Sequence, residues 1–348
     1  MALDLTVDAV QLTEDLVNIE SVSGDEQEIA DALESALRGL DHLEVQRFGN
    51  TVVARTHQGR DERVVIAGHI DTVPLNDNLP ARRDETRLHG LGTCDMKGGV
   101  AVALRIAATM AVTNRDITYL FYECEEVEAE RNGLQLLSET HPDLLQADFA
   151  ILMEPSDGVV DAQGPLAARG ERAHSARSWT GVNAIHGAAE VLARLNAYEP
   201  RRPVIDGLEY REGLNAVFVS GGVAGNVLPD VCTVSVNHRF APDRSVKEAV
   251  AHVREVFDGF EVEVTDSAPA AMPGLSVPAA AAFIEAVGGT ANPKFGWTDV
   301  ARFSGLGIPA VNFGPGDPHL AHKQDEFVPI DHIGTVEEQL RAWLEEAR

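Results

Sequence analysis

The sequence predicts an α/β protein with a mixed, largely parallel sheet, into which a smaller α+β domain is inserted. Apolar runs at residues 64–67, 117–122 and 149–152 alternate with helical stretches, which is typical of strands buried inside a parallel sheet. Between residues 168 and 270 the expected order changes to that of a ferredoxin-like split βαβ domain. A length of 348 residues also favours two domains. We therefore expect one discontinuous domain, residues 1–167 and 271–348, and one inserted domain, residues 168–270.

The first elements can be predicted from local signals. Ser23 and Glu26 have the spacing of a capping box and precede apolar residues at helical spacing, which predicts a helix over residues 24–38. Gly49 and Asn50 predict a tight hairpin turn. Further helices are expected at residues 98–111 and 133–139.

The same periodicities predict the rest of the chain. In the inserted domain we expect strands at residues 167–174, 215–220, 231–240 and 260–264 and helices at 183–197 and 245–257. In the last segment we expect helices at residues 277–287, 299–304 and 334–346 and a strand at 308–313.

The composition excludes several classes of function. Acidic residues number 55 and basic residues 28, so the net charge of −27 argues against nucleic acid or an anionic membrane as a partner. There is no apolar run of transmembrane length and no signal-peptide pattern, so we expect a cytoplasmic protein. Cys94, Cys124 and Cys232 are too few and odd in number for a disulfide framework.

A histidine and an aspartate follow the strand at residues 64–67. His69 and Asp71 are two apart on an extended chain, so both side chains point the same way. Asp71 could then hold one ring nitrogen of His69 while the other nitrogen binds a metal ion. Taken alone, the pair also fits an ordinary buried histidine.

A glycine-rich loop at residues 90–99 contains a single carboxylate, Asp95. The loop lacks the order of residues that a phosphate-binding loop requires. Glycines let the backbone approach closely around Asp95, which suits an aspartate whose two oxygens bridge two metal ions.

Paired carboxylates follow the strand at residues 117–122. Glu125 and Glu126 repel each other unless a cation lies nearby or one of them is protonated. One could bind metal while the other acts as general base, and the alternative is a solvated acidic loop. Glu154 ends another strand, and His322 follows a late one. Two histidines and three carboxylates at the carboxyl ends of strands are what a two-zinc hydrolase needs.

Together these motifs resemble the co-catalytic dizinc metallopeptidase and deacylase family, in the same order and over nearly the whole chain. The resemblance implies a zinc-peptidase-like catalytic domain with two Zn²⁺ ions, with Co²⁺ or Mn²⁺ as alternatives in one site. It implies that His69 and Glu154 bind one ion, that Glu126 and His322 bind the other, and that Asp95 bridges them. Glu125 would be the general base, Asp71 would assist catalysis, and a cis peptide bond would follow Asp95.

The inserted domain carries part of the resemblance. Residues 170–175 are similar to the stretch whose histidine, here His174, reaches the partner subunit's active site and stabilises the oxyanion. This implies a homodimer formed through residues 168–270, which would serve as a dimerisation and lid domain. His174 could instead be an ordinary strand histidine, and Arg239 a surface arginine. The residues implied to bind an anionic N-acyl amino acid are Asn226, Arg239, Gly296 and Thr298, with Arg172, Arg177 and Lys97 as further cations.

Three stretches indicate the branch of the family. Residues 92–99, 121–130 and 296–303 resemble most the succinyl-diaminopimelate desuccinylases of actinobacterial type. This implies hydrolysis of N-succinyl-LL-2,6-diaminopimelate to succinate and LL-2,6-diaminopimelate, a step of lysine biosynthesis. An acetylornithine deacetylase, a dipeptidase or carboxypeptidase of the same family, and a catalytically silent zinc-binding or scaffolding relative remain alternatives. The presence of Glu125 together with a full ligand set argues against the silent relative.

Overall fold

The computed structural model describes residues 3–155, 160–267, 270–289, 291–292 and 298–345. The chain forms two compact units. Unit 1 comprises Met1–Asp157, Gly274–Ala291 and Arg302–Arg348, and unit 2 comprises Gly158–Pro273 and Asn292–Ala301. The first boundary lies earlier than the expected position between residues 167 and 168, because the strand Val160–Arg169 pairs within the sheet of unit 2.

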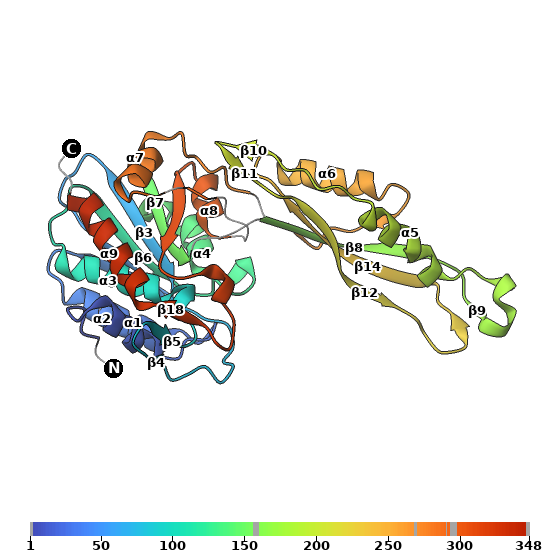
Figure 1. Ribbon diagram of the computed structural model, residues 1–348, viewed down its shortest axis with the longest axis horizontal. Helices are drawn as coiled ribbons and strands as arrows, with labels where there is room; N and C mark the ends of the chain where they lie inside the picture. The colour runs from blue at the N-terminus through green and yellow to red at the C-terminus, as the bar shows by residue number, and fades with distance from the viewer. Residues whose placement is uncertain (1–2, 156–159, 268–269, 290, 293–297, 346–348) are drawn as a thin grey trace. The chain divides into compact units, whose positions relative to one another are not determined.

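A six-stranded sheet lies at the centre of unit 1, in the order β1-β2-β6-β3-β7-β17 (Figure 1). β3 is parallel to both β6 and β7, and β17 is parallel to β7, whereas β1 and β2 pair antiparallel at one edge. The prediction of a mixed, largely parallel sheet is confirmed. The strands are β1 Glu44–Phe48, β2 Thr51–Arg55, β3 Arg63–His69, β6 Asp116–Tyr122, β7 Phe149–Pro155 and β17 Ala310–Gly314.

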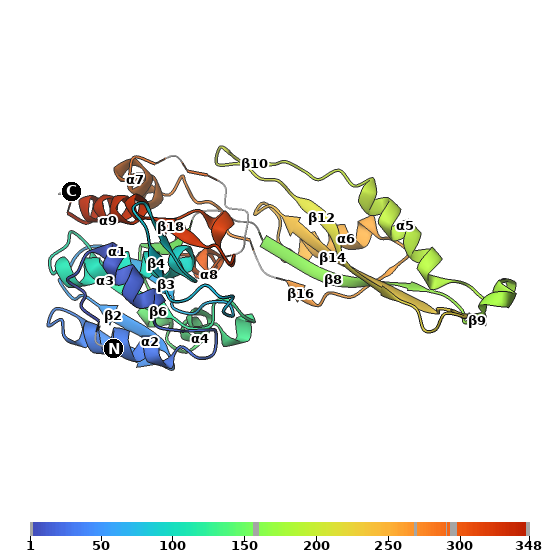
Figure 2. The ribbon, with the colours of Figure 1, turned by 60° about the horizontal axis from the view of Figure 1, so that its bottom comes forward.

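Helices cover this sheet. α1, α3 and α9 contact one another (Figure 2). α3 also packs on β3 and β7. Their buried faces join strand residues such as Ile66 and Ile151 in one apolar core. The helices that contribute to unit 1 are α1 Ala9–Val17, α2 Gln27–Arg38, α3 Gly98–Thr109, α4 Gly133–Thr140, α7 Pro278–Ala286, α8 Val300–Gly305, which begins in unit 2, and α9 Ile330–Glu345.

A small antiparallel sheet brings the end of the chain to the glycine-rich loop. β18 (Phe327–Pro329) pairs with β5 (Arg87–His89), which pairs with β4 (Arg82–Arg83). This pairing places the segment from His322 to Glu326 beside the loop that contains Asp95.

The hairpin prediction is confirmed, but the capping-box prediction is wrong. Gly49, with φ of 61°, and Asn50 connect β1 to β2. α2 begins at Gln27, and the Glu26 side chain forms no capping hydrogen bond there. Ser23 Oγ instead donates to the Asp71 carboxylate, and Glu26 accepts from the backbone of Cys124. Both side chains are used in tertiary contacts that a local pattern does not reveal.

Unit 2 contains an antiparallel sheet in the order β12-β14-β8-β15. The first strand in the chain, β8, therefore lies between the third and the fourth, as a split βαβ arrangement requires. α5 and α6 share an apolar core with this sheet, including Leu166, Val234 and Phe257. The main elements are β8 Val160–Arg169, α5 Ala184–Asn196, β12 Gly213–Gly221, β14 Val231–Phe240, α6 Val246–Val256 and β15 Glu261–Val262.

The remaining strands of unit 2 are short. β9 (Ala173–His174), expected as part of the first strand, pairs instead with β13 (Val227–Leu228). The others are β10 Val204–Ile205, β11 Leu208–Glu209 and β16 Asp266–Ser267. None of the described helices in either unit has the length and hydropathy needed to cross a membrane.

Candidate metal centre

The predicted ligands lie at one edge of the unit 1 sheet. β3, β6, β7 and β17 are parallel, so their carboxyl ends meet at the same edge, where open α/β sheets bind their ligands. His69 is the last residue of β3, and Glu154 lies near the end of β7. Glu125 and Glu126 follow β6, and His322 follows β17. Asp95 comes from the turn Thr93–Lys97 in front of α3, and the peptide bond after it is cis, as the family resemblance implied.

The aspartate lies between the two histidines. Asp95 Oδ1 is 3.1 Å from His69 Nε2, and Asp95 Oδ2 is 3.4 Å from His322 Nε2. Glu154 Oε1 is 3.9 Å from His69 Nε2, and Glu126 Oε1 is 2.8 Å from His322 Nε2. The five side chains thus form two groups, His69–Asp95–Glu154 and Asp95–Glu126–His322, whose potential ligand atoms lie within 4.8 Å of one another. Asp95 belongs to both groups.

Asp71 contacts both the histidine and the paired glutamates. His69 Nδ1 is 3.1 Å from the Asp71 carbonyl oxygen and 3.4 Å from Oδ1. The two carboxylate oxygens of Asp71 also accept from the backbone amides of Glu125, at 3.0 Å, and Glu126, at 3.1 Å. Asp71 is completely buried, so these hydrogen bonds compensate a large desolvation cost. The arrangement leaves Nε2 of His69 as the nitrogen that faces Asp95.

The carboxylates raise the pKa of both histidines. Burial alone would lower the pKa of His69, but Asp71, Asp95 and Glu154 hold it well above its usual value. Hydrogen bonds to Asp95 and Glu126 raise the pKa of His322 to about 10. Burial would raise the pKa of Asp95, yet the two histidines lower it. A site that stabilises two cationic rings so strongly also attracts divalent cations.

Close backbone packing fixes the end of β7. A side chain on Gly99 or on Gly314 would overlap the carbonyl of Met153. Glycine at these two positions lets the start of α3 and the end of β17 approach the strand that carries Glu154.

Two buried glutamates that the sequence analysis did not assign to the site hold its loops. Glu326 Oε1 accepts from the amides of Cys94, at 2.9 Å, and Asp95, at 3.2 Å, and burial raises the pKa of Glu326 to about 7. Glu26 contacts Cys124 in the loop that precedes Glu125. In the sequence, Glu26 has only the spacing of a capping residue and Glu326 is only a carboxylate near His322, so neither pattern indicates a buried carboxylate beside the site.

Lys97 does not supply an accessible cation. Its side chain is buried, Nζ donates to the Ile19 carbonyl at 2.8 Å, and burial lowers its pKa to about 7. Cys94 is also buried and contacts the Asp317 carbonyl, which fits a packing residue.

The other predicted residues belong to unit 2. His174 is exposed and pairs with Val227, so it lies beside Asn226 across the β9–β13 ladder. Arg239 lies on β14, and Thr298 is buried. Gly296 lies outside the described residues. The geometry of unit 1 therefore brings together His69, Asp71, Asp95, Glu125, Glu126, Glu154 and His322.

Fold and site define a family. The model of peptidase family M20/M25/M40 matches residues 65–346, and the chain belongs to this family. The chain is 48% identical to a Corynebacterium glutamicum protein named succinyl-diaminopimelate desuccinylase, over 99% of this chain and 98% of the relative. It is 53% identical to a Mycobacterium tuberculosis protein that carries the same name provisionally, over 98% of this chain and 99% of the relative.

Solved structures share the fold. A Staphylococcus aureus tripeptidase superposes with a TM-score of 0.77 at 22% identity, covering 98% of each chain. A Bacillus subtilis protein described as a dinuclear metal-binding peptidase of family M20 superposes with a TM-score of 0.69 at 18% identity, covering 97% of this chain and 96% of that one.

Proposed function

We propose that the chain is a two-metal amide hydrolase that converts N-succinyl-LL-2,6-diaminopimelate to succinate and LL-2,6-diaminopimelate. The observation that carries this proposal is the position of Asp95, whose two oxygens face different histidines at 3.1 and 3.4 Å. A carboxylate that only served as a hydrogen-bond acceptor for one buried histidine would not need a second histidine on its other oxygen.

The donor set fits two divalent ions. Imidazole nitrogens and carboxylate oxygens are ligands that Zn²⁺ accepts readily, and Co²⁺ or Mn²⁺ also accepts them. We assign His69 and Glu154 to one ion, Glu126 and His322 to the other, and Asp95 to both. Such ions, when bound, polarise the amide carbonyl and lower the pKa of water.

We assign the role of general base to Glu125. Its backbone amide is fixed by Asp71, and its carboxylate lies in a group with His69 and Glu126. In the proposed reaction Glu125 takes a proton from the attacking water, whose oxygen bonds to the amide carbon. Glu125 then returns the proton to the leaving nitrogen as the carbon–nitrogen bond breaks. The products are a carboxylate and an amine.

The succinyl substrate is proposed from the named relatives at 48% and 53% identity. A succinyl group adds a free carboxylate, so we assign its recognition to Arg239, with Asn226 and Thr298 as polar partners and Gly296 as a pocket residue. His174 is assigned to stabilise the oxyanion in the partner's site. A cytoplasmic location stays a prediction from the sequence.

A second copy of this chain is the partner that we propose for unit 2. Among the described strands, β12 pairs only with β14, and Val217, Phe218 and Val219 on this edge strand are 58%, 62% and 51% exposed. An apolar edge strand left open promotes pairing with another chain. In analytical ultracentrifugation we expect the wild-type protein to be a dimer and Phe218→Lys to be a monomer. A monomeric wild-type protein would rule out both the proposed dimer and the proposed role of His174.

The substrate is tested by comparing kcat/KM for N-succinyl-LL-2,6-diaminopimelate and N-acetylornithine, with metal-loaded and chelated protein side by side. Chelator-sensitive turnover of the succinyl compound, faster than that of the acetyl compound, is expected. Faster turnover of the acetyl compound would indicate a deacetylase instead. No turnover of either compound with metal bound would favour a dipeptidase or a catalytically silent relative.

A further inference from the structure

Glu26 is a buried carboxylate for which neither the metal centre nor the helix accounts. It is 0% exposed and lies immediately before α2, where it forms no capping bond within the described chain. Burying an ionisable group is unfavourable unless hydrogen bonds replace the lost water. The partners of Glu26 therefore indicate what the residue does.

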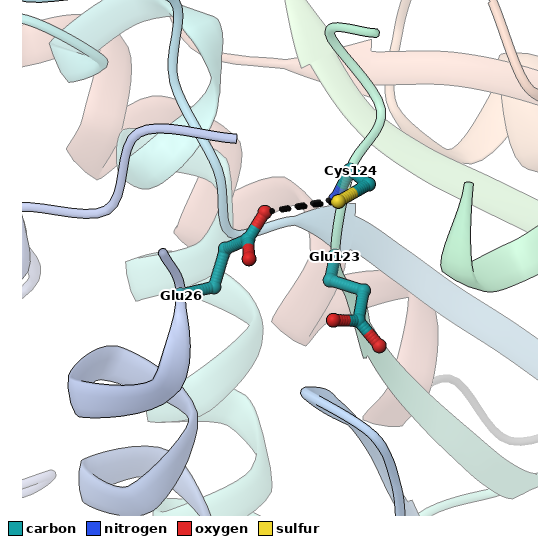
Figure 3. A group of neighbouring side chains, drawn as sticks. All are labelled: Glu26, Glu123 and Cys124. Atoms are coloured by element: carbon teal, nitrogen blue, oxygen red, sulfur yellow. Dashed lines mark hydrogen bonds between the residues drawn. The ribbon is translucent and has the colours of Figure 1, made fainter. Parts of the chain in front are cut away.

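Two of its three hydrogen-bond donors belong to Cys124, in the loop that contains the proposed general base. Figure 3 shows the Glu26 side chain reaching from the start of α2 to the backbone nitrogen of Cys124. Oε1 accepts from this nitrogen at 3.2 Å, from the Cys124 thiol at 3.3 Å and from the Gly24 amide at 2.7 Å. The contact joins residues 98 positions apart in the sequence.

With this contact, the backbone amides of three consecutive residues, 124–126, all donate to buried carboxylates. Asp71 accepts from the amides of Glu125 and Glu126, and Glu26 accepts from that of Cys124, so three consecutive backbone donors point at two buried carboxylates. Cys124 has a φ of 56°, a left-handed conformation that is unfavourable for a non-glycine residue and needs support from its surroundings. Ser23, in the same turn as Glu26, donates to Asp71 at 2.7 Å. The turn before α2 thus supports both carboxylates that hold the loop.

A separate metal site is a weaker explanation of the same residues. Glu26, Glu123 and Cys124 each offer a potential ligand atom within 4.8 Å of the others. Glu26 Oε2 is buried without a hydrogen-bond partner among the described residues, but Glu26 Oε1 already accepts from three donors, and Glu123 Oε1 accepts from the Asn50 amide at 2.8 Å. Burial also raises the pKa of the Cys124 thiol to about 12, which disfavours the thiolate that would bind a metal.

We propose that Glu26 is a positioning residue that sets the place of Glu125 and Glu126 by accepting the hydrogen bond of the Cys124 amide. The inference rests on the proposed function for the roles of those two glutamates. Without Glu26, the Cys124 amide becomes a buried donor lacking its acceptor, and the loop relaxes to find another. A displacement of about 1 Å at a catalytic group can cost about a hundredfold in rate.

The test compares Glu26→Ala, Glu26→Asp and Glu26→Gln. Alanine removes the acceptor, aspartate keeps the charge but is one methylene too short, and glutamine keeps a carbonyl oxygen at the same reach. Glu28→Ala is the control, because Glu28 is an exposed acid in the first turn of the same helix. Three quantities are measured: hydrogen exchange of the peptide covering residues 120–127, Zn²⁺ affinity by competition with a chelator, and kcat and KM.

In Glu26→Ala and Glu26→Asp we expect the hydrogen-exchange rate of the amides at residues 124–126 to rise about tenfold or more, because less free energy is needed to open this loop locally. The affinity for the more weakly held Zn²⁺ should fall about tenfold, and kcat should fall about ten- to a hundredfold with KM within about threefold. Glu26→Gln should keep amide exchange, Zn²⁺ affinity and kcat within about threefold of wild type. The control Glu28→Ala should stay within the same range.

A merely structural role would lower the folded fraction while leaving exchange at this loop, Zn²⁺ affinity and kcat per folded site unchanged. That outcome in either Glu26→Ala or Glu26→Asp, or a folded Glu26→Gln as impaired as alanine, would overturn the proposal. If the Glu26→Ala protein does not fold, the same measurements on Glu26→Asp test the proposal. Exchange and Zn²⁺ affinity need no substrate, so wild-type protein that fails to hydrolyse the succinyl compound would overturn the proposed function alone.

Discussion

Replacing Glu125 by glutamine removes the proposed base with little other change. Glutamine has the same size as glutamate, and the backbone amide at this position would still be held by Asp71. The five assigned metal ligands remain, so metal content should stay at the wild-type value. What is lost is a carboxylate beside His69 and Glu126 that can accept a proton.

The expected loss follows from that single change. A positioned general base contributes about 10² to 10⁴ in rate, or about 3–5 kcal/mol of transition-state free energy. We therefore expect kcat for Glu125→Gln to fall by this factor, with KM and bound Zn²⁺ close to wild type. The assay is steady-state hydrolysis together with metal analysis by mass spectrometry. Glu130→Gln, an exposed acid in the same run of carboxylates, is the matched control and should retain wild-type kcat.

The result that refutes this reasoning is a Glu125→Gln protein with full metal and a rate within about tenfold of wild type, which is less than a general base contributes. Equal losses in Glu125→Gln and Glu130→Gln would also refute it, because they would indicate a general effect of negative charge.

Two further predictions concern unit 2. His174→Ala should lower kcat with unchanged metal content, whereas the exposed His186→Ala should not; an unchanged kcat for His174→Ala would exclude it from the site. Burial and neighbouring His252 lower the pKa of the fully buried His238 to about 4. Because the unfolded chain then binds a proton that folded His238 does not, unit 2 should lose stability as pH falls from about 6.5 towards 4. Thermal unfolding of His238→Leu across this range should show a weaker pH dependence, and an identical profile would contradict the assignment.

The sheet, and the clustering of the proposed ligands at its edge, could be predicted from the sequence because both leave local signals. Continuous apolar runs mark the parallel strands, and the histidines and carboxylates follow these runs directly. Asp95 could be predicted because glycines surround a single carboxylate.

The residues that support the site could not be predicted in this way. Glu26 has the spacing of a capping residue, but its buried carboxylate accepts from an amide 98 positions away. Glu326 likewise holds the amides of Cys94 and Asp95, more than 200 positions away. Such partners depend on how distant segments pack, and periodicity carries no information about them.

The most direct test of the two-metal account is the number of Zn²⁺ ions bound per chain at buffered free zinc, for wild type and for Asp95→Asn. The account predicts two ions for wild type, and fewer than two for Asp95→Asn at the same free zinc, because one of the shared oxygens is lost. A single ion in wild type, or two ions of unchanged affinity in Asp95→Asn, would contradict it.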